Sequence, residues 1–407
     1  MKELTEVCKQ FLINVVDSVI KQLPRNNNKW VYGALGGFRD NPKYLFYQAR
    51  ERHPEIRSIW ISPNKDEVKI IRKHGGEAYY YHSLRGLYHI MTSRVAVCDH
   101  TLRDISRFFT GGVYYVNLWH GSSVKRVRWQ APDYFVRRFR LKSAEEMHTS
   151  FRLRMLQYHV LYKVPDLCLA PSVIQAEEFF APMMNIPLEH CLVGVYPRSQ
   201  LLINGKEEAM EFIDKYEPDT TIDFVRKLSA YNKTYIYMPT WRNDGVDFIK
   251  KAGIDWGELN EMLSQKNELL VLKFHPFTSI DSDAVSGFCN IVLYPSNSDI
   301  YTVLPFIDCL ITDYSSIYTD FLIMNKEVIL FVFDYNDYVK GSYDLEDFDE
   351  FYVGMRAYNF MQLLKVMESG VDCHVPKEHY HRLMDFFWSS NQYHIDIVEE
   401  IKRRTSR

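Results

Sequence analysis

The stretch from Leu304 to Phe333 constrains the fold more than any other, because two short apolar runs flank a segment with a helical pattern. The runs Ile307–Ile311 and Val328–Phe333 have the length of buried strands, and the second is rich in β-branched and aromatic residues. Between them, Ser315–Met324 places its apolar residues on one helix face. Strand, helix and strand in this order build parallel sheets, so we expect an α/β protein.

The junction of the first strand with the helix is a candidate anion site. Asp313 ends the strand, and Ser315 and Ser316 open the helix. All three are residue types that cap helices, and the free N–H groups of a first helical turn bind anions such as phosphates. A plain helix cap is the alternative. The choice between the two interpretations depends on the motifs in the rest of the chain.

The same alternation of strands and helices continues along the chain and predicts two doubly wound domains. The polar stretch Asn204–Leu228 interrupts it, and we place the junction just before, which gives domains of residues 1–196 and 197–407. The other predicted strands are Trp30–Leu35, Ile56–Ile61, Ala78–Tyr81, Arg94–Cys98, Val113–Leu118, Leu167–Ala170, Cys191–Val195, Thr234–Met238, Leu269–Phe274 and Ile291–Tyr294. The other predicted helices are Val7–Leu23, Lys43–Arg52, Glu67–His74, Leu84–Met91, Val173–Phe180, Asp255–Leu263, Ile300–Leu304 and one or two within Tyr380–Arg403.

The composition excludes several classes of protein. A net charge of −3 argues against a protein that coats nucleic acid. The seven cysteines are scattered and form no Cys-x-x-Cys pair, so we expect neither a disulfide framework nor a zinc site, and a reducing compartment such as the cytoplasm. No apolar run reaches the roughly 18 residues of a transmembrane helix, and charges interrupt the N-terminal segment, which is therefore no secretory signal. Any membrane contact would be peripheral.

Two segments are candidates for such contact. Apolar residues recur about once per turn in Val7–Leu23, which predicts a helix docked on the first domain or, alternatively, lying on a membrane. The segment of residues 125–163 holds ten Lys or Arg against three acids, with aromatic residues between them. It suits a surface for anionic lipid headgroups and equally a solvated basic helical face. Nucleic acid is a weaker candidate, because the rest of the chain adds no basic support.

Unusual polar residues directly follow four of the predicted strands. In open α/β sheets, ligands bind outside the carboxyl ends of the strands, so these residues could meet across an interdomain cleft. Another strand ends at Asp99-His100. The four motifs are Trp119-His120-Gly121 in the first domain and Thr240-Trp241-Arg242, His275-Pro276 and Asp313-Tyr314-Ser315-Ser316 in the second.

These residues suit transfer from a nucleotide diphosphate donor. The N–H groups of Ser315 and Ser316 could hold the pyrophosphate, and Arg242 could neutralise it bidentately. His275 could donate to the phosphate oxygens or to the leaving group, and Asp320, one turn into the helix, could accept from ribose hydroxyls.

His120, in the other domain, is then the candidate general base for an acceptor hydroxyl, because an imidazole has a suitable pKa. Asp281-Ser282-Asp283 is an Asp-x-Asp, which some glycosyltransferases use for a divalent metal, but no strand pattern precedes it. Gly36-Gly37 is no dinucleotide fingerprint. We therefore expect neither a metal nor another cofactor.

At these positions the sequence resembles the CDP-glycerol glycerophosphotransferase family of teichoic acid and capsule synthesis, from about Gly36 to Tyr338. The motifs follow one another in the order of that family. They are Asp40-Asn41-Pro42-Lys43-Tyr44-Leu45, Trp119-His120-Gly121-Ser122-Ser123-Val124-Lys125, Tyr196-Pro197-Arg198, Pro239-Thr240-Trp241-Arg242, Phe274-His275-Pro276 and Thr312-Asp313-Tyr314-Ser315-Ser316.

The resemblance implies a GT-B fold, in which two Rossmann-like domains face a cleft and the second domain binds most of the donor. It implies metal-independent transfer of glycerol phosphate from CDP-glycerol to a lipid-linked or glycan acceptor at the inner membrane face, with release of CMP. By motif, His120 and His275 are catalytic. The donor-side residues are Arg242, Asp313, Ser315, Ser316, Asp320, Thr240 and Arg198, and the acceptor-side residues are Gly121, Lys125, Asp40 and Asn41.

Other functions stay open. After Tyr338 the family usually has a Gly-x-Tyr block and then Pro-Gly-Pro, whereas this chain has only Gly341-Ser342-Tyr343 and later Tyr352-Val353-Gly354. The C-terminal Asp-Gly signature of the family is also missing. A GT-B glycosyltransferase that uses CDP-ribitol or another nucleotide-activated sugar is therefore an alternative. An alternative of another class is a non-catalytic protein that binds anionic lipid or polymer through the basic segment.

Overall fold

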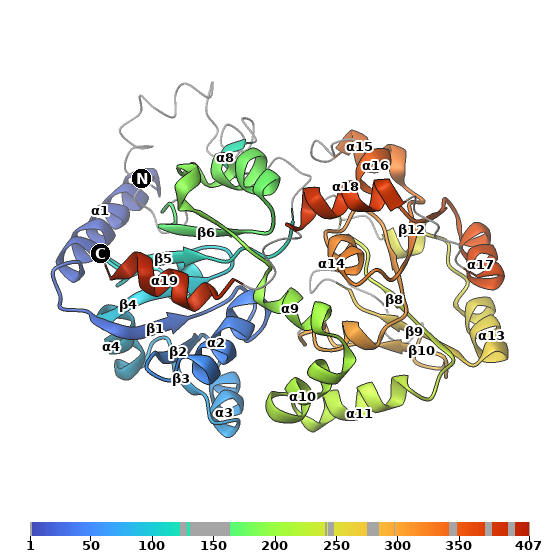
Figure 1. The fold of residues 1–407 in the computed structure, drawn as a ribbon, viewed down its shortest axis with the longest axis horizontal. Helices are drawn as coiled ribbons and strands as arrows, with labels where there is room; N and C mark the ends of the chain where they lie inside the picture. Colours follow the sequence, from blue (N-terminus) through green and yellow to red (C-terminus); the bar gives the residue numbers. More distant parts are fainter. Residues whose placement is uncertain are drawn as a thin grey trace. The chain divides into compact units, whose positions relative to one another are not determined.

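The computed structural model describes residues 2–122, 128–130, 163–240, 242, 248–274, 285–296, 298–341, 348–370, 377–389 and 395–406 (Figure 1). The chain divides into two compact units. Unit 1 comprises Met1–His120, Arg126–Arg198 and Phe386–Arg407, and unit 2 comprises Gly121–Lys125 and Ser199–Asp385. The chain passes from unit 1 to unit 2 within helix α9, Pro197–Asn204.

The C-terminal segment lies in unit 1, whereas the sequence analysis assigned it to the second domain. Helix α19, Ile397–Thr405, buries Ile397, Val398 and Ile401, which recur at helical spacing on one face. The carboxylate of Asp396 at its N-cap lies 2.8 Å from Nε2 of His53. The apolar face of α19 can be recognised in the sequence. The sequence does not indicate that this face packs on unit 1.

Within the described residues, unit 1 is built on a parallel sheet of seven strands in the order β3-β2-β1-β4-β5-β6-β7. The order reverses between β1 and β4, and the carboxyl ends of strands at such a point are where doubly wound sheets bind ligands. The strands are β1 Asn26–Tyr32, β2 Arg57–Ser62, β3 Glu77–Tyr80, β4 Ser93–Cys98, β5 Tyr114–Asn117, β6 Leu167–Ala170 and β7 Cys191–Val193. The helices are α1 Lys2–Ile20, α2 Asp40–Arg52, α3 Lys65–Lys73, α4 Leu84–Thr92, the π-helix Gln175–Phe180 and α8 Ala181–Met184, with short 3₁₀ turns at Leu102–Asp104, Arg128–Gln130 and Leu188–His190.

The described part of unit 2 is built on a parallel sheet of six strands in the order β10-β9-β8-β11-β12-β13, and here the order reverses between β8 and β11. The strands are β8 Lys233–Tyr237, β9 Glu268–Leu272, β10 Ile291–Leu293, β11 Cys309–Thr312, β12 Glu327–Phe331 and β13 Met355–Ala357. The helices are α10 Lys206–Tyr216, α11 Asp219–Leu228, α12 Phe248–Lys251, α13 Trp256–Lys266, α14 Ile317–Ile323, α15 Tyr335–Gly341, α16 Phe348–Phe351, α17 Phe360–Ser369 and α18 Lys377–Phe387, with a 3₁₀ turn at Leu304–Phe306.

The expected strand-helix-strand unit is present as β11, α14 and β12, with β11 and β12 paired in parallel. The stretch Asn204–Leu228, interpreted as polar and charged, forms helices α10 and α11 instead. Each buries three residues on one face: Ala209, Ile213 and Tyr216 in α10, and Thr221, Val225 and Leu228 in α11.

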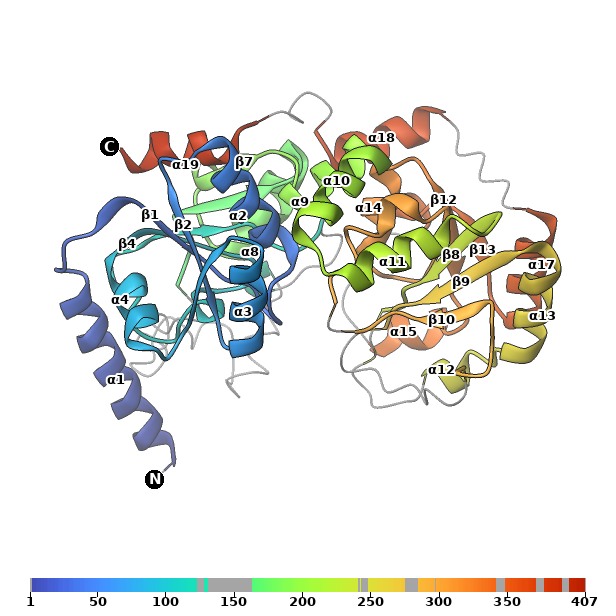
Figure 2. The ribbon, with the colours of Figure 1, turned by 90° about the horizontal axis from the view of Figure 1, so that it is seen from below.

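Helix α1 contacts unit 1 through a different face from the one expected. Ile20 is buried, and Gly111 lies so close to α1 that a Cβ there would collide with the backbone oxygen of Asp17. The predicted apolar stripe, by contrast, is exposed, with Phe11 at 60% and Val19 at 61% of their full accessible surface. Figure 2 shows α1 running away from the sheet of unit 1, and among the described residues its C-terminal part packs closely against Gly111.

None of the helices in the described ranges has both the length and the apolar character that crossing a membrane requires. The described cysteines Cys98, Cys168, Cys191, Cys289 and Cys309 are free thiols.

Candidate active site

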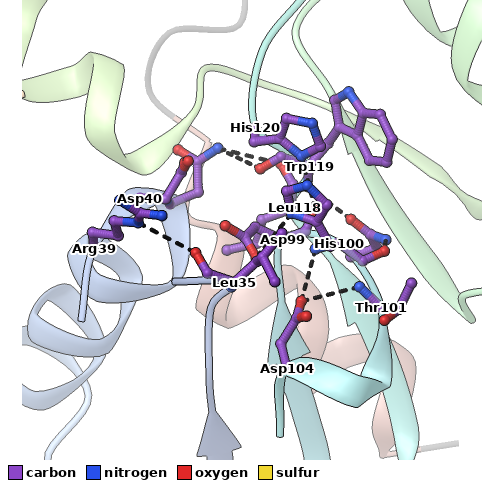
Figure 3. Close-up of polar contacts among 12 residues, drawn as sticks. Leu35, Arg39, Asp40, Asp99, His100, Thr101, Asp104, Leu118, Trp119 and His120 are labelled. Carbon is purple, nitrogen blue, oxygen red and sulfur yellow. Dashed lines mark hydrogen bonds and ion pairs between the residues drawn. The ribbon is translucent and has the colours of Figure 1, made fainter. Parts of the chain in front are cut away.

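The polar residues that follow β1, β4 and β5 meet at the switch point of unit 1. The N–H of Leu35, after β1, donates to Asp99 Oδ1 across 3.1 Å, and the N–H of Leu118, after β5, donates to the Cys98 oxygen across 2.8 Å. His100 and His120 therefore lie side by side at the ends of two adjacent strands (Figure 3).

The backbone that carries His120 is fixed by three side chains. Asn117 Oδ1 accepts from the N–H of Trp119 across 2.8 Å, and Asn41 Nδ2 donates to the Trp119 oxygen across 2.8 Å. Arg198 Nη2 donates to the His120 oxygen across 3.0 Å. Trp119 itself has a left-handed backbone with φ of 52°, a conformation that costs energy for a bulky residue and that these contacts maintain.

Asp40 and Arg198 connect this turn to helix α2. Arg198 Nη1 lies 2.7 Å from Asp40 Oδ1, and the N–H of Arg198 donates to Asn41 Oδ1 across 3.3 Å. Asn41 and Arg198 are almost fully buried. The sequence motifs predict Arg198 on the donor side and Asp40 and Asn41 on the acceptor side. The structure brings all three together around the turn that carries His120.

His120 is in the form that a general base requires. Its Nδ1 lies 3.2 Å from the backbone oxygen of Asp99. A carbonyl oxygen only accepts, so Nδ1 carries the proton and Nε2 holds a free lone pair. Burial, followed by the charge of His100, keeps the pKa of His120 well below its ordinary value. The ring is therefore neutral at pH 7 and able to take a proton through Nε2.

Unit 2 has its own constellation at its switch point, centred on the fully buried Asp313. Asp313 Oδ1 accepts from the N–H groups of Thr240 and Tyr314 across 2.8 and 2.6 Å. Its Oδ2 lies 2.8 Å from Arg242 Nη2. The carboxylate thus ties the end of β8 to the end of β11.

Arg242 is also held by Asp334, a residue that the sequence analysis missed. Nε and Nη2 of Arg242 contact the two oxygens of Asp334 across 2.9 and 3.0 Å. Burial alone would lower the pKa of the guanidinium, but Asp313 and Asp334 outweigh it and raise that pKa. Both carboxylates pair with this one guanidinium, so in this arrangement protein groups already balance its charge. Asp334 follows β12 closely, and the same strand-end rule that found Asp313 could have found it.

Of the other donor-side residues of unit 2, Asp320 is occupied by protein hydroxyls, whereas the hydroxyls of Ser315, Ser316 and Thr240 have no hydrogen-bond partner among the described residues. Asp320 is buried, and its oxygens accept from Ser199 Oγ and Tyr301 Oη across 3.0 and 2.9 Å, so protein hydroxyls occupy both. The hydroxyls of Ser315 and Ser316 make no hydrogen bond to any described residue, and Ser316 is exposed. Thr240 Oγ1 is buried without a hydrogen-bond partner in the described part of the chain.

Several expected features lie outside the described residues. They are the candidate catalytic His275, the acceptor-side Lys125, the Asp-x-Asp at Asp281 and Asp283, Trp241, and nearly all of the basic segment of residues 125–163. Gly121 is described and has φ of 155°.

Two groups of described residues bring three potential metal ligands close together: His53, Glu55 and Glu399, and Asp99, His100 and Asp104. We assign a metal to neither. In the first group, His53 pairs with both Glu55 and Glu399, and Lys402 pairs with the same two acids. In the second, Asp104 Oδ2 accepts from the N–H of His100 across 2.9 Å, and Asp99 is bound by Leu35. Metal independence of the reaction stays a prediction.

Residues 16–395 match the model of the CDP-glycerol:poly(glycerophosphate) glycerophosphotransferase family. The chain belongs to this family. The match spans nearly the whole chain and confirms the resemblance drawn from the motifs.

Relatives of this chain include proteins named as teichoic acid polymerases. The chain is 25% identical over 326 residues to the teichoic acid poly(glycerol phosphate) polymerase of Staphylococcus epidermidis, a match that covers 76% of this chain and 41% of that polymerase. It is 22% identical over 353 residues to the polymerase of the same name from Bacillus spizizenii, covering 82% of this chain and 81% of that one. The chain thus spans less than half the length of the first relative and most of the second.

Solved structures of the wall teichoic acid polymerase TagF share the fold of this family member. A TagF variant soaked with CDPG aligns with a TM-score of 0.73 at 21% identity, covering 100% of this chain and 96% of that chain. TagF without the soak gives a TM-score of 0.71 at 21% identity with the same coverage. The two parallel sheets and this likeness confirm the expected α/β fold of GT-B type. The predicted domain boundary and the cleft stay predictions.

Proposed function

We propose that this glycerophosphotransferase family member moves glycerol phosphate from CDP-glycerol to a hydroxyl of a lipid-linked or polymer acceptor, in teichoic acid or capsule synthesis, and releases CMP. The observation that carries the proposal is the match to the family over residues 16–395, with the neutral His120 at a strand end inside it. The TagF structure soaked with CDPG supports the same class of donor.

In this reaction His120 acts as the general base. Its Nε2 takes the proton of the acceptor hydroxyl as the oxygen attacks the β-phosphorus of the donor. The bond from that phosphorus to the bridging oxygen breaks, and CMP leaves with this oxygen and the bonding electrons. Asp40, Asn41 and Arg198 hold the His120 turn, which places the base without touching the donor. Gly121 and Lys125 keep their predicted place on the acceptor side.

On the donor side, the groups that suit a diphosphate are the N–H groups and hydroxyls of Ser315 and Ser316 and the unpartnered hydroxyl of Thr240. Arg242, Asp313 and Asp320 hold the loops that present them. Direct contact of Arg242 with the phosphates or of Asp320 with the ribose would require their present partners to separate. His275 keeps its predicted role toward the leaving group.

We expect the transfer to need no divalent metal, because hydrogen-bond donors and helix N–H groups could stabilise the developing charge. Full activity in excess EDTA supports this. Strict dependence on Mg²⁺ or Mn²⁺ that Asp281→Ala abolishes would contradict it and assign the Asp-x-Asp loop to a metal.

The alternative donor is CDP-ribitol or another nucleotide-activated sugar. A relative named teichoic acid ribitol-phosphate polymerase from Staphylococcus aureus is 25% identical over 200 residues, covering 47% of this chain and 36% of that polymerase. Calorimetry with CDP-glycerol, CDP-ribitol and UDP- and GDP-sugars separates these donors. A non-catalytic anion binder predicts that His120→Ala leaves function intact.

We also propose that the protein works at the inner face of the cell membrane and binds its anionic surface. Two observations support this: the basic, aromatic composition of residues 125–163, and the apolar side chains that α1 leaves exposed.

A further inference from the structure

The imidazoles of His100 and His120 lie face to face. Their ring centroids are 3.8 Å apart and their planes differ by 4° (Figure 3). His100 follows β4 and His120 follows β5, and these strands are neighbours, so the sheet itself sets the distance between the rings. The motifs of the sequence predict no role for His100.

Asp99 contacts both rings. Its backbone oxygen accepts from Nδ1 of His120 across 3.2 Å, and its Oδ1 lies 3.5 Å from Nδ1 of His100. The carboxylate is itself fixed by the N–H of Leu35 and its side chain is only 2% exposed. A buried carboxylate next to an imidazole favours the protonated form of that imidazole.

The backbone of His100 is equally well fixed. Its N–H donates to Asp104 Oδ2 across 2.9 Å, and its oxygen accepts from Asn117 Nδ2 across 3.0 Å. Asn117 also holds the backbone of Trp119, so one side chain joins the two histidine loops. These backbone hydrogen bonds hold the two loops, and with them the stacked rings, in place.

We propose that His100 is a positioning residue for His120: it holds the ring of His120 by face-to-face stacking and, as the cation partnered by Asp99, opposes a second positive charge on it. The inference rests on the proposed role of His120 as the base. It explains how a histidine beside a carboxylate stays unprotonated, since the carboxylate of Asp99 is paired with the other ring.

The directions of the two pKa shifts agree with a charged His100 and a neutral His120. Burial alone would lower the pKa of His100, but Asp99, with Asp104 and Asp40, outweighs it and raises that pKa. Burial and His100 together lower the pKa of His120. The charged and titratable groups near the two rings include Asp99 after β4, Asp104 in the 3₁₀ turn, Asp40 at the start of α2, Arg198 in α9 and Tyr115 in β5, whose hydroxyl donates to the His100 oxygen across 3.5 Å. Arg128 lies over the ring of Trp119.

The test is the acidic limb of the pH profile of kcat/KM, which reports protonation of the base. His100→Phe keeps a flat ring for stacking and removes the charge. We expect the acidic limb to move to higher pH by about one unit, because like charges at this separation shift a pKa by that order. On the acidic limb this is about a tenfold loss of rate. An unchanged profile would overturn the proposal.

Two more variants distinguish the charge from packing. His100→Arg retains a planar cation that can pair with Asp99, and should keep the acidic limb at its wild-type position. His100→Gln removes the charge with a smaller side chain and carries the same prediction as His100→Phe, so a folding defect of one variant leaves the other as a test. If Arg and Phe variants share one profile, the role of His100 is packing alone.

A readout without catalysis separates this inference from the proposed function. NMR titration of ring-labelled histidines, with the His120 signal assigned by its absence in His120→Ala, measures the pKa of His120 directly. A rise in that pKa in His100→Phe supports the inference even if CDP-glycerol is not the donor. Transfer from CDP-glycerol with no such rise overturns the inference and leaves the function standing.

Discussion

Arg242 Nη2 lies 2.8 Å from Asp313 Oδ2, and this buried ion pair joins the ends of β8 and β11 at the switch point of unit 2. Asp334 completes the arrangement from the end of β12. Three adjacent strand ends are therefore held by one guanidinium, which makes Arg242 a determinant of stability as well as of the site.

Replacement of Arg242 by Ala should destabilise unit 2 strongly. It leaves two buried carboxylates without a counter-charge, and breaking a buried pair in this way costs about 3–5 kcal/mol. The matched control is Arg356→Ala, because Arg356 pairs with the exposed Asp349 and such pairs contribute less than about 1 kcal/mol. Thermal unfolding of both variants checks the difference; equal shifts in melting temperature would contradict it.

Replacement of Asn41 by Ala should lower kcat with donor affinity retained. The buried Asn41 holds the Trp119 backbone, and a displacement of the base of about 1 Å costs roughly 10²-fold in rate. Asn232→Ala is the control, since the exposed Asn232 also donates to a backbone oxygen, that of Lys266, away from both sites. Loss of donor binding in Asn41→Ala, measured by calorimetry, would instead show that Asn41 contacts the donor.

Most strands could be predicted because each is a short apolar run, and the strand-end rule then selected His120, Thr240 and Asp313. Helices α10 and α11 were missed because charged residues fill their exposed faces and conceal a buried face of only three residues each. Strand β13, Met355–Ala357, has three residues, too few for a periodic signal.

The side-chain contacts at the site could not be predicted from the sequence, for a different reason. Sequence spacing indicates which strand end carries a residue but not what the side chain contacts. Arg242 and Asp320 were therefore predicted to meet the donor, while the structure shows them held by Asp313, Asp334, Ser199 and Tyr301. For the same reason His100 drew no prediction, although it follows a predicted strand.

Stability should fall as the pH drops from about 6.5 to about 4, in part because of His89. Burial, followed by Lys29 and Arg57, lowers the pKa of His89 to about 4 in the folded protein. Between the unfolded and folded values the unfolded chain binds the extra proton, so acid favours unfolding. His89→Phe preserves stacking on Tyr79, 4.6 Å away, and should reduce the acid sensitivity. Urea unfolding at several pH values measures how the free energy of unfolding changes with pH. The control variant His381→Gln, at an exposed site, should leave this pH dependence unchanged.

Membrane binding should depend on both candidate segments. We expect co-sedimentation with anionic vesicles, poor binding to neutral ones and release by salt, since each engaged basic residue contributes ~1 kcal/mol. Phe11→Ser with Val19→Ser should weaken binding, whereas Leu84→Ser, at a residue 87% exposed on α4, should not. Neutralisation of five basic residues should weaken it without changing nucleotide affinity: Arg137, Arg138, Arg140, Arg152 and Arg154. Equal binding of all variants would mean that neither segment meets the membrane.

The most direct test of the proposed function is CMP release from CDP-glycerol in the presence of lipid-linked or glycan acceptors, measured for wild type and His120→Ala. We predict release by the wild type and a loss of ~10²–10⁴-fold in His120→Ala, with calorimetric affinity for CDP-glycerol retained. No CMP release with any acceptor, while CDP-ribitol or a nucleotide sugar turns over, would contradict the assignment of CDP-glycerol as the donor.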